Sequence, residues 1–299
     1  MVRIVRNALP KGRLTSLLPP GDLSRPAVED FRIQHLNLFI LQTVPTLNPV
    51  TFVPSHLTAP SQFAASGTDP DPLDNPIWHA LLTEQSALAI GNGLARRFPA
   101  EIGPLCGVPD QSAASYEALR LLTGPGGVVG LFFTEPAAPP SGWTILRAGL
   151  IDQMVCLAHR NEESAQPEHE PTPRRLTAAD VPAMLELATL TEPGPFEQRT
   201  IELGAFLGIF DGERLLAMAG QRLRLPGFTE VSGVCTHPDA RGRGYARILM
   251  DRVMDEIAKR GKTPFLHVLS ENSAAISVYQ SLGFIARRTL HLGVLRNDG

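Results

Sequence analysis

The second half of the chain alternates between segments with helical and strand-like spacing of apolar residues. Residues 205–225 hold two apolar runs joined at Asp211-Gly212, a dipeptide typical of a β-hairpin turn. Leu249, Val253 and Ile257 recur at helical spacing and predict one buried stripe on a helix that ends near Gly261. Other apolar runs predict helices over 176–190 and 272–283 and strands over 227–238, 263–270 and 284–296.

The first half shows a weaker version of the same pattern. Apolar spacing predicts helices over 77–89 and 112–124, and strands over 127–135 and 143–157. The whole pattern indicates an α/β fold with a mixed, mostly antiparallel sheet, and a second, smaller α/β domain N-terminal to it. We expect a Pro-rich, poorly ordered extension over residues 1–70 and the smaller domain over 71–165. A linker over 166–170 then leads to the larger domain over 171–299.

Composition narrows the class of protein. The 299 residues are 43% hydrophobic and 19% charged, which is typical of a soluble globular protein. The net charge of −3 gives no reason to expect nucleic acid or an anionic membrane as a partner. Cys106, Cys156 and Cys235 have neither metal-ligand spacing nor the pattern of a disulfide framework, so we expect no metal site and a cytoplasmic location.

The turn at residues 241–246, Arg-Gly-Arg-Gly-Tyr-Ala, joins a predicted strand to a predicted helix. The first N–H groups of a helix are unpaired and lie at the positive end of its dipole. Small residues let a phosphate approach that backbone closely, and Arg241 and Arg243 add positive charge. The sequence therefore predicts a pyrophosphate-binding turn.

Two common phosphate-binding loops do not fit this turn. A Walker loop needs Gly-Lys followed by Ser or Thr, which the sequence lacks. A dinucleotide-binding turn needs a third Gly or Ala where this chain has Arg247, and it begins a βαβ unit, whereas a predicted hairpin precedes this turn.

The turn resembles the acyl-coenzyme A loop of the GNAT acetyltransferase superfamily, through its pattern Arg-x-x-Gly-x-Ala at 241–246. A second pattern, Asn-x-x-Ala-x-x-x-Tyr-x-x-x-Gly-Phe at 272–284, matches the family in spacing, and the expected element order over 171–299 agrees with it. The first half would then be a degenerate GNAT-like domain. The first half has no such loop, so we expect it to bind no coenzyme. We expect it instead to cover a sheet edge and to form a wall of the acceptor cleft.

The resemblance implies an N-acetyltransferase that depends on acetyl-coenzyme A, and it leaves open whether other acyl-coenzyme A donors are used. The acceptor would be a primary amine of a small molecule or a peptide N-terminus, attacking directly in a ternary complex. Strands 228–236 and 263–270 would splay apart, pantetheine would lie between them, and a main-chain N–H near Val234 or Cys235 would polarise the thioester. The implied coenzyme-binding residues are Val234, Cys235, Thr236, Arg241, Gly242, Arg243, Gly244, Tyr245, Ala246, Asn272 and Tyr279.

The resemblance also implies catalytic roles. Tyr279 would protonate the departing thiolate, and Glu230 would act as the base for the amine. Strand alternation would put Glu230, Ser232 and Val234 on one face, with ~13 Å from Glu230 to Val234, so the base would act through water or Ser232. The segment 189–200 would line the acceptor side.

Each of these residues has a structural alternative. Glu230 could be an ordinary solvated strand residue paired with an arginine, Tyr279 a packed core tyrosine, and Asn272 only a helix N-cap. Cys235 lies in mid-strand with no base nearby, which favours an inert thiol over an acyl-enzyme intermediate. His267 is expected in the core.

The alternative function is a noncatalytic acyl-coenzyme A binding or regulatory module that has kept the turn and lost turnover. In either case we expect a coenzyme A donor as a partner, and for the enzyme an amine acceptor. No nucleic acid and no membrane are expected, and a homodimer is left open.

Overall fold

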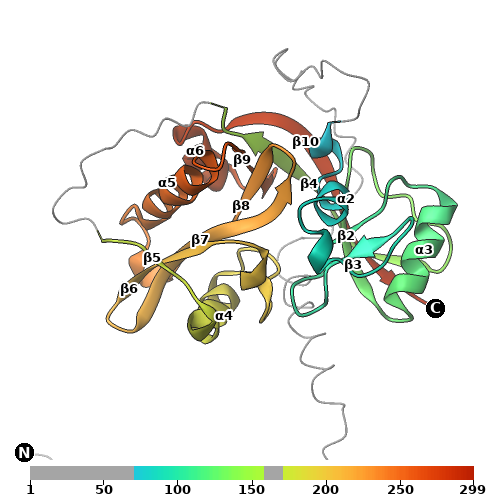
Figure 1. The fold of residues 1–299 in the computed structure, drawn as a ribbon, viewed down its shortest axis with the longest axis horizontal. Coiled ribbons are helices and arrows are strands. Elements are labelled where there is room, and N and C mark those ends of the chain that lie inside the picture. The colour runs from blue at the N-terminus through green and yellow to red at the C-terminus, as the bar shows by residue number, and fades with distance from the viewer. Residues whose placement is uncertain (1–70, 158–170) are drawn as a thin grey trace, which may run out of the picture. The chain divides into compact units, whose positions relative to one another are not determined.

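The computed structural model describes residues 71–157 and 171–299 (Figure 1). The expected extension (1–70) and linker (166–170) lie outside the described residues. The longer helices and strands are α2 (Pro76–Leu82), α3 (Ala113–Thr123), β3 (Val128–Phe133), β4 (Trp143–Val155), β5 (Arg174–Arg175), α4 (Val181–Thr191), β6 (Phe206–Asp211), β7 (Arg214–Leu225), β8 (Phe228–Thr236), α5 (Tyr245–Ala258), β9 (Thr263–Leu269), α6 (Ser273–Ser281) and β10 (Ile285–Asn297). The shorter strands are β1 (Arg96–Arg97) and β2 (Cys106–Gly107). The described residues also contain 3-10 helices of three or four residues, including η5 (Thr200–Leu203) and η6 (Pro238–Ala240).

Eight strands form one sheet in the order β3-β10-β4-β9-β8-β7-β6-β5. Every neighbouring pair is antiparallel except β8 and β9, which are parallel. This agrees with the expected mixed, mostly antiparallel α/β fold. The predicted hairpin is also present, since Asp211 and Arg214 pair across the turn between β6 and β7.

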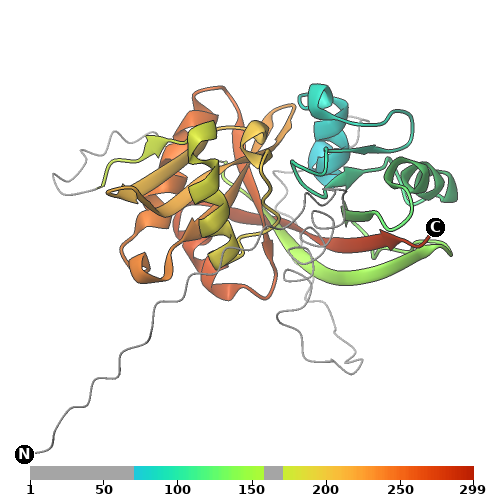
Figure 2. The same ribbon diagram turned by 90° about the horizontal axis from the view of Figure 1, so that it is seen from below.

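The sheet does not follow the expected division into two domains. The first-half strand β4 lies between β10 and β9, and β3 pairs with the far side of β10 (Figure 1, Figure 2). The first half therefore supplies an inner strand and an edge strand of the shared sheet, where we expected a separate domain covering an edge. Long-range strand pairing of this kind leaves no local pattern in a sequence.

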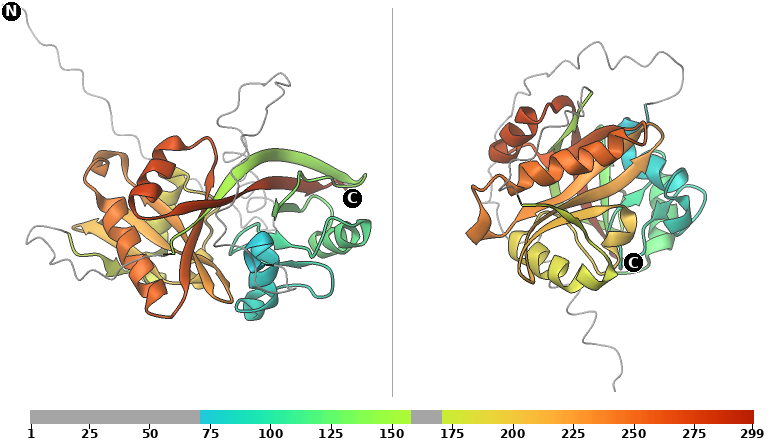
Figure 3. Two further views of the ribbon diagram at one scale, coloured as in Figure 1. Left: turned by 90° about the horizontal axis from the view of Figure 1, so that it is seen from above. Right: turned by 60° about the vertical axis from the view of Figure 1, so that its left-hand side comes forward.

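Helices cover opposite faces of the second-half strands (Figure 3). The predicted stripe of α5 is buried against one face, with Leu249, Val253 and Ile257 all at most 1% exposed. On the opposite face, α4 packs Met184 and Leu187 into a second apolar cluster. The alternating residues of β7 serve both clusters, as strand geometry requires.

A third apolar cluster joins the two halves. Ile77 and Leu81 of α2 pack with Leu223 of β7, Phe265 of β9 and Leu290 of β10. The helix predicted over 77–89 is shorter than expected, because α2 ends at Leu82 and the chain then turns the side chain of Gln85 into the interior. Consequently the first half packs against β7 and β9, the two neighbours of β8, and β8 carries the predicted site residues Glu230, Val234, Cys235 and Thr236.

Candidate active site

The parallel strands β8 and β9 separate part of the way along. They pair only where Phe228–Glu230 meets Thr263–Phe265, and from there β9 continues along β4 instead. The splay implied by the resemblance is therefore present. A cavity of about 250 Å³ lies beyond the branch point, lined by Thr191, Val234, Cys235, Thr236, Arg241, Ala246, Met250, Ala275, Val278 and Tyr279. We call it the splay cavity.

The Gly-rich turn lies at the N-terminus of α5, which Gly244 caps. Gly242 and Gly244 have φ of +76° and +77°, a conformation that glycine adopts without strain. A Cβ at either position would have no atom within 4 Å, so the backbone is open to a ligand. Arg241 lines the splay cavity, and Nη2 of Arg243 donates to the carbonyl of Asp239. These features fit an anionic group held by backbone N–H groups.

The second predicted pattern brings Tyr279 to the same cavity. Asn272 accepts a hydrogen bond from the N–H of Ala275 at 3.1 Å, so it does cap α6. Tyr279 packs against Phe284 with ring centroids 6.2 Å apart, and burial raises the pKa of its hydroxyl. The phenol is therefore protonated near neutral pH and can donate a proton into the cavity.

The predicted coenzyme-binding residues separate into two groups. Val234, Cys235, Thr236, Arg241, Ala246 and Tyr279 line the splay cavity together. The second group does not line the cavity and lies at or just before the N-termini of α5 and α6: Gly242, Arg243, Gly244, Tyr245 and Asn272. Tyr245 also packs on the apolar cluster beneath α5.

Cys235 is 6% exposed, and burial raises the pKa of its thiol to about 11. The thiolate, which is the nucleophile, is therefore scarce at neutral pH. This agrees with the inert thiol favoured from the sequence.

A β-bulge at Gly233 overturns the alternation expected along β8. Ser232 pairs with Gly220 and Cys235 with Met218, so three residue steps on β8 oppose two on β7. Gly233 has a φ of +62°. Glu230 and Val234 therefore lie on opposite faces, because one extra residue reverses the in-and-out order of side chains. The expectation that they share a face was wrong.

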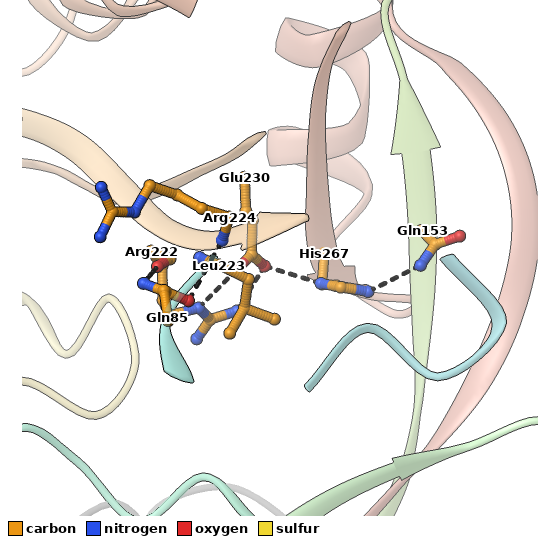
Figure 4. A network of polar contacts seen from close by, with 7 residues as sticks. All are labelled: Gln85, Gln153, Arg222, Leu223, Arg224, Glu230 and His267. Atoms are coloured by element: carbon orange, nitrogen blue, oxygen red, sulfur yellow. Dashed lines mark hydrogen bonds and ion pairs between the residues drawn. The ribbon is translucent and has the colours of Figure 1, made fainter. Parts of the chain in front are cut away.

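Glu230 lies at the centre of a buried polar network (Figure 4). Its carboxylate accepts from Arg222 at 2.8 Å (Nε) and 2.6 Å (Nη2), from the N–H of Leu223 at 3.3 Å, and bonds Nδ1 of His267 at 2.7 Å. Burial acts to raise the pKa of Glu230, but the charge and hydrogen bonds of Arg222, together with the hydrogen bond to His267, outweigh it and lower the pKa to about 2. A carboxylate held in this way is a weak base, so the geometry disfavours the base role expected for Glu230.

Two glutamines of the first half belong to the same network and carried no signal in the sequence. Gln153 of β4 contacts Nε2 of His267 at 3.1 Å, and burial lowers the pKa of that histidine. With His267 neutral, Nδ1–H donates to Glu230 and Nε2 accepts from Gln153. Gln85 bonds the backbone of β7 next to Arg222. Only long-range packing brings these residues together, so no local motif could have identified them.

The segment expected on the acceptor side does line a small cavity of about 10 Å³. Its walls come from Pro193, Gly194, Pro195, Phe196, Thr200, Phe206, Arg222, Ser232 and Gly233. We call it the Ser232 cavity. Ser232 and Gly233 directly precede Val234 and Cys235 of the splay cavity, so consecutive residues at the bulge of β8 line the two cavities.

Within residues 71–157 and 171–299, no three His, Cys, Asp or Glu side chains are grouped closely enough to hold a metal ion. The same residues contain no helix with the length and apolarity needed to cross a membrane.

Comparisons with known proteins agree on one family. The FR47-like protein family matches residues 206–291. The chain is 32% identical over 120 residues to a [ribosomal protein bS18]-alanine N-acetyltransferase of Salmonella typhimurium, covering 36% of this chain and 77% of that protein. An enzyme of the same name from Escherichia coli K12 is 42% identical over 52 residues, which cover 17% of this chain and 35% of that protein.

A solved structure extends the likeness into the first half. A GNAT-family protein of Novosphingobium aromaticivorans is 37% identical, with a TM-score of 0.69, and the match covers 77% of this chain and all of that one (100%). With the splay, the Gly-rich turn and Tyr279 in one place, these likenesses mean that the chain belongs to the GNAT family and is an N-acetyltransferase.

Proposed function

We propose that the protein transfers an acetyl group from acetyl-coenzyme A to the α-amine of a peptide N-terminus, by direct attack in a ternary complex. The observation that carries the proposal is the splay cavity, in which the Gly-rich turn, the bulged strand and Tyr279 meet. Relatives named as alanine N-acetyltransferases support an α-amine as the acceptor.

Different groups in and beside the splay cavity would bind different parts of the donor. The N–H groups at the start of α5, with Arg241 and Arg243, would hold the pyrophosphate. Backbone groups of β8 beyond Glu230 have no partner strand on the β9 side and can bond the pantetheine amides. The donor supplies an activated thioester, and a main-chain N–H near Val234 or Cys235 would stabilise negative charge on its carbonyl oxygen.

Tyr279 supplies the acid. Burial keeps its hydroxyl protonated, and its side chain lines the splay cavity together with residues of β8. In the proposed reaction the neutral amine nitrogen forms a bond to the acetyl carbon, the carbon–sulfur bond breaks, and Tyr279 protonates the sulfur. The nitrogen then loses its extra proton through water, and that proton restores the phenol of Tyr279, so that an amide and a free thiol are released.

An α-amine lessens the need for a strong base. Its ordinary pKa is about 7.7–8.0, against about 10.4 for a lysine side chain, so a sizeable fraction is neutral near pH 7.5. We therefore assign Glu230 to holding Arg222 in place, and expect the amine to lose its first proton to water. This assignment fits a carboxylate whose pKa is about 2.

The test combines calorimetry with acetyl-coenzyme A and a thiol-release assay on three acceptors. These are a peptide with a free N-terminal alanine, the same peptide blocked at its N-terminus and carrying one lysine, and a small primary amine. Release with the first peptide alone is expected. Release with the small amine alone would refute the acceptor, and binding without any release would favour a noncatalytic module.

A further inference from the structure

Arg222 lies between two small cavities on the acceptor side. One is the Ser232 cavity. The other, also about 10 Å³, is lined by Phe98, Ile102, Gly103, Pro104, Leu105, Pro195, Leu203 and Arg222. Arg222 and Pro195 are common to both. A volume of this size holds one water molecule, or one oxygen atom of a ligand in its place.

The guanidinium of Arg222 is only partly used by the protein. Within the described parts of the chain, Nε and Nη2 both donate to Glu230, which leaves Nη1 as the nitrogen available to a ligand. The side chain is 15% exposed, whereas that of Glu230 is 0% exposed. Because Glu230 balances its charge, Arg222 offers a hydrogen-bond donor rather than a net positive charge. Its natural partner is an uncharged carbonyl oxygen.

Gln85 fixes the backbone that carries Arg222. The pairing of β7 with β8 is irregular between Gln221 and Arg224, so some β7 backbone groups lose their strand partner there. Gln85 replaces that partner: its Nε2 donates to the carbonyl of Arg222 at 2.8 Å, and its Oε1 accepts from the N–H of Arg224 at 3.2 Å. Gln85 is 1% exposed, so water cannot easily substitute for it.

The segment that contributes Thr200 to the lining of the Ser232 cavity is also fixed by the first half. Oγ1 of Thr200 donates to the carbonyl of Ile102 at 2.8 Å, and the N–H of Arg199 donates to the carbonyl of Glu101 at 2.8 Å. The first half therefore fixes both the backbone that carries Arg222 and the segment that contributes Thr200.

We propose that Arg222 binds a carbonyl oxygen of the acceptor through Nη1, and that Gln85 is the positioning residue that keeps it there. The carbonyl is that of the first peptide unit, so the inference rests on the proposed function. The first half of the chain then takes part in acceptor selection although it holds none of the residues of the splay cavity.

The test uses two acceptors that differ in one oxygen atom. One is an alanyl peptide, and the other is its analogue with a trans carbon–carbon double bond in place of the first peptide bond. We take the ratio of kcat/KM for the two acceptors in each enzyme, so that differences in amine pKa cancel between enzymes. The variant is Arg222→Met with Glu230→Gln, which removes both buried charges together and avoids leaving one unpaired.

The preference for the carbonyl acceptor is expected to fall about tenfold in this double variant, as for the loss of one good hydrogen bond. The matched control is Arg120→Met with Glu117→Gln, an exposed pair on α3 with the same bidentate geometry, which should leave the ratio unchanged. A ratio within twofold of the wild type in the Arg222 variant would overturn the proposal. If the wild type acetylates only small amines, the proposed acceptor fails first and this inference fails with it.

Gln85→Met tests the positioning role separately. We expect the KM for the peptide to rise several-fold and the carbonyl preference to fall, while the Kd for acetyl-coenzyme A stays the same. Gln111→Met is the control, because Gln111 bonds only exposed first-half groups at Pro136 and Ala138 and a tyrosine beside them. An unchanged KM and an unchanged preference in folded Gln85→Met protein would refute the positioning role.

Discussion

Replacing Glu230 by glutamine tests whether this residue is a structural counter-ion or a catalytic base. Its side chain is 0% exposed and its two oxygens are bonded to Arg222, to His267 and to the N–H of Leu223. Glutamine keeps the size of the side chain but has no charge and turns one acceptor into a donor. Arg222 would then remain buried without its counter-ion.

Two lines of reasoning give the size of the effect. Breaking a buried ion pair by removing one partner costs roughly 3–5 kcal/mol. The pKa of Glu230 falls from an ordinary 4.5 to about 2 on folding, which corresponds to about 3 kcal/mol of stability. Because the folded-state pKa is the lower one, this stabilisation is complete above pH 4.5 and is lost as the pH falls towards 2.

The assay is urea denaturation of wild type and Glu230→Gln between pH 3 and pH 8, followed by kinetics on the folded variant. The gap in unfolding free energy should be about 3 kcal/mol at pH 7 and should shrink below pH 4.5. Glu117→Gln, which removes an exposed carboxylate with the same bidentate partner geometry, should change stability little. Equal stability of Glu230→Gln and wild type at pH 7, with kcat lowered 100-fold or more, would refute the counter-ion role and restore the catalytic base.

Three further predictions concern the splay cavity. Gly244→Glu should abolish coenzyme A binding in calorimetry. The control Gly227→Glu, at a similarly positive φ of +80° in an open turn, should retain binding. Equal loss of binding in both variants would indicate backbone strain as the cause instead. Tyr279→Phe should lower kcat about 100-fold and leave coenzyme A affinity within twofold, and an unchanged kcat would exclude it as the acid. Mass spectrometry after incubation with acetyl-coenzyme A alone should find Cys235 unmodified, since its thiol pKa is about 11, and an acetylated Cys235 would contradict direct transfer.

The predicted site residues that the structure brings together in one cavity were identified from local chemistry. The turn at 241–246 combines small residues, arginines and a helix start within six positions, and the structure places Arg241 and Ala246 on one cavity with Tyr279. The hairpin at Asp211-Gly212 and the apolar stripe of α5 likewise follow from short-range spacing. Periodicity and turn chemistry act over a few residues, so a single sequence displays them directly.

The role of Glu230 could not be derived in that way. The alternation of side chains along β8 cannot be counted through Gly233, because the sequence Ser-Gly-Val does not indicate a bulge. The extra residue at the bulge moves each later side chain to the opposite face of the sheet. The partners of Glu230 come from β7 and β9, and these partners lower its pKa to about 2 although burial acts to raise it.

The sequence by itself determined the element order of the second half, and it singled out the Gly-rich turn at 241–246 and Tyr279, which contribute to the lining of one cavity. Tertiary structure decided that β4 enters the sheet between β9 and β10, and that Gln85 and Gln153 meet Arg222 and His267 across the two halves. The physical reason is that strand partners and buried polar contacts are selected by the free energy of the whole packed sheet. That free energy depends on groups more than a hundred residues apart, which no local pattern records.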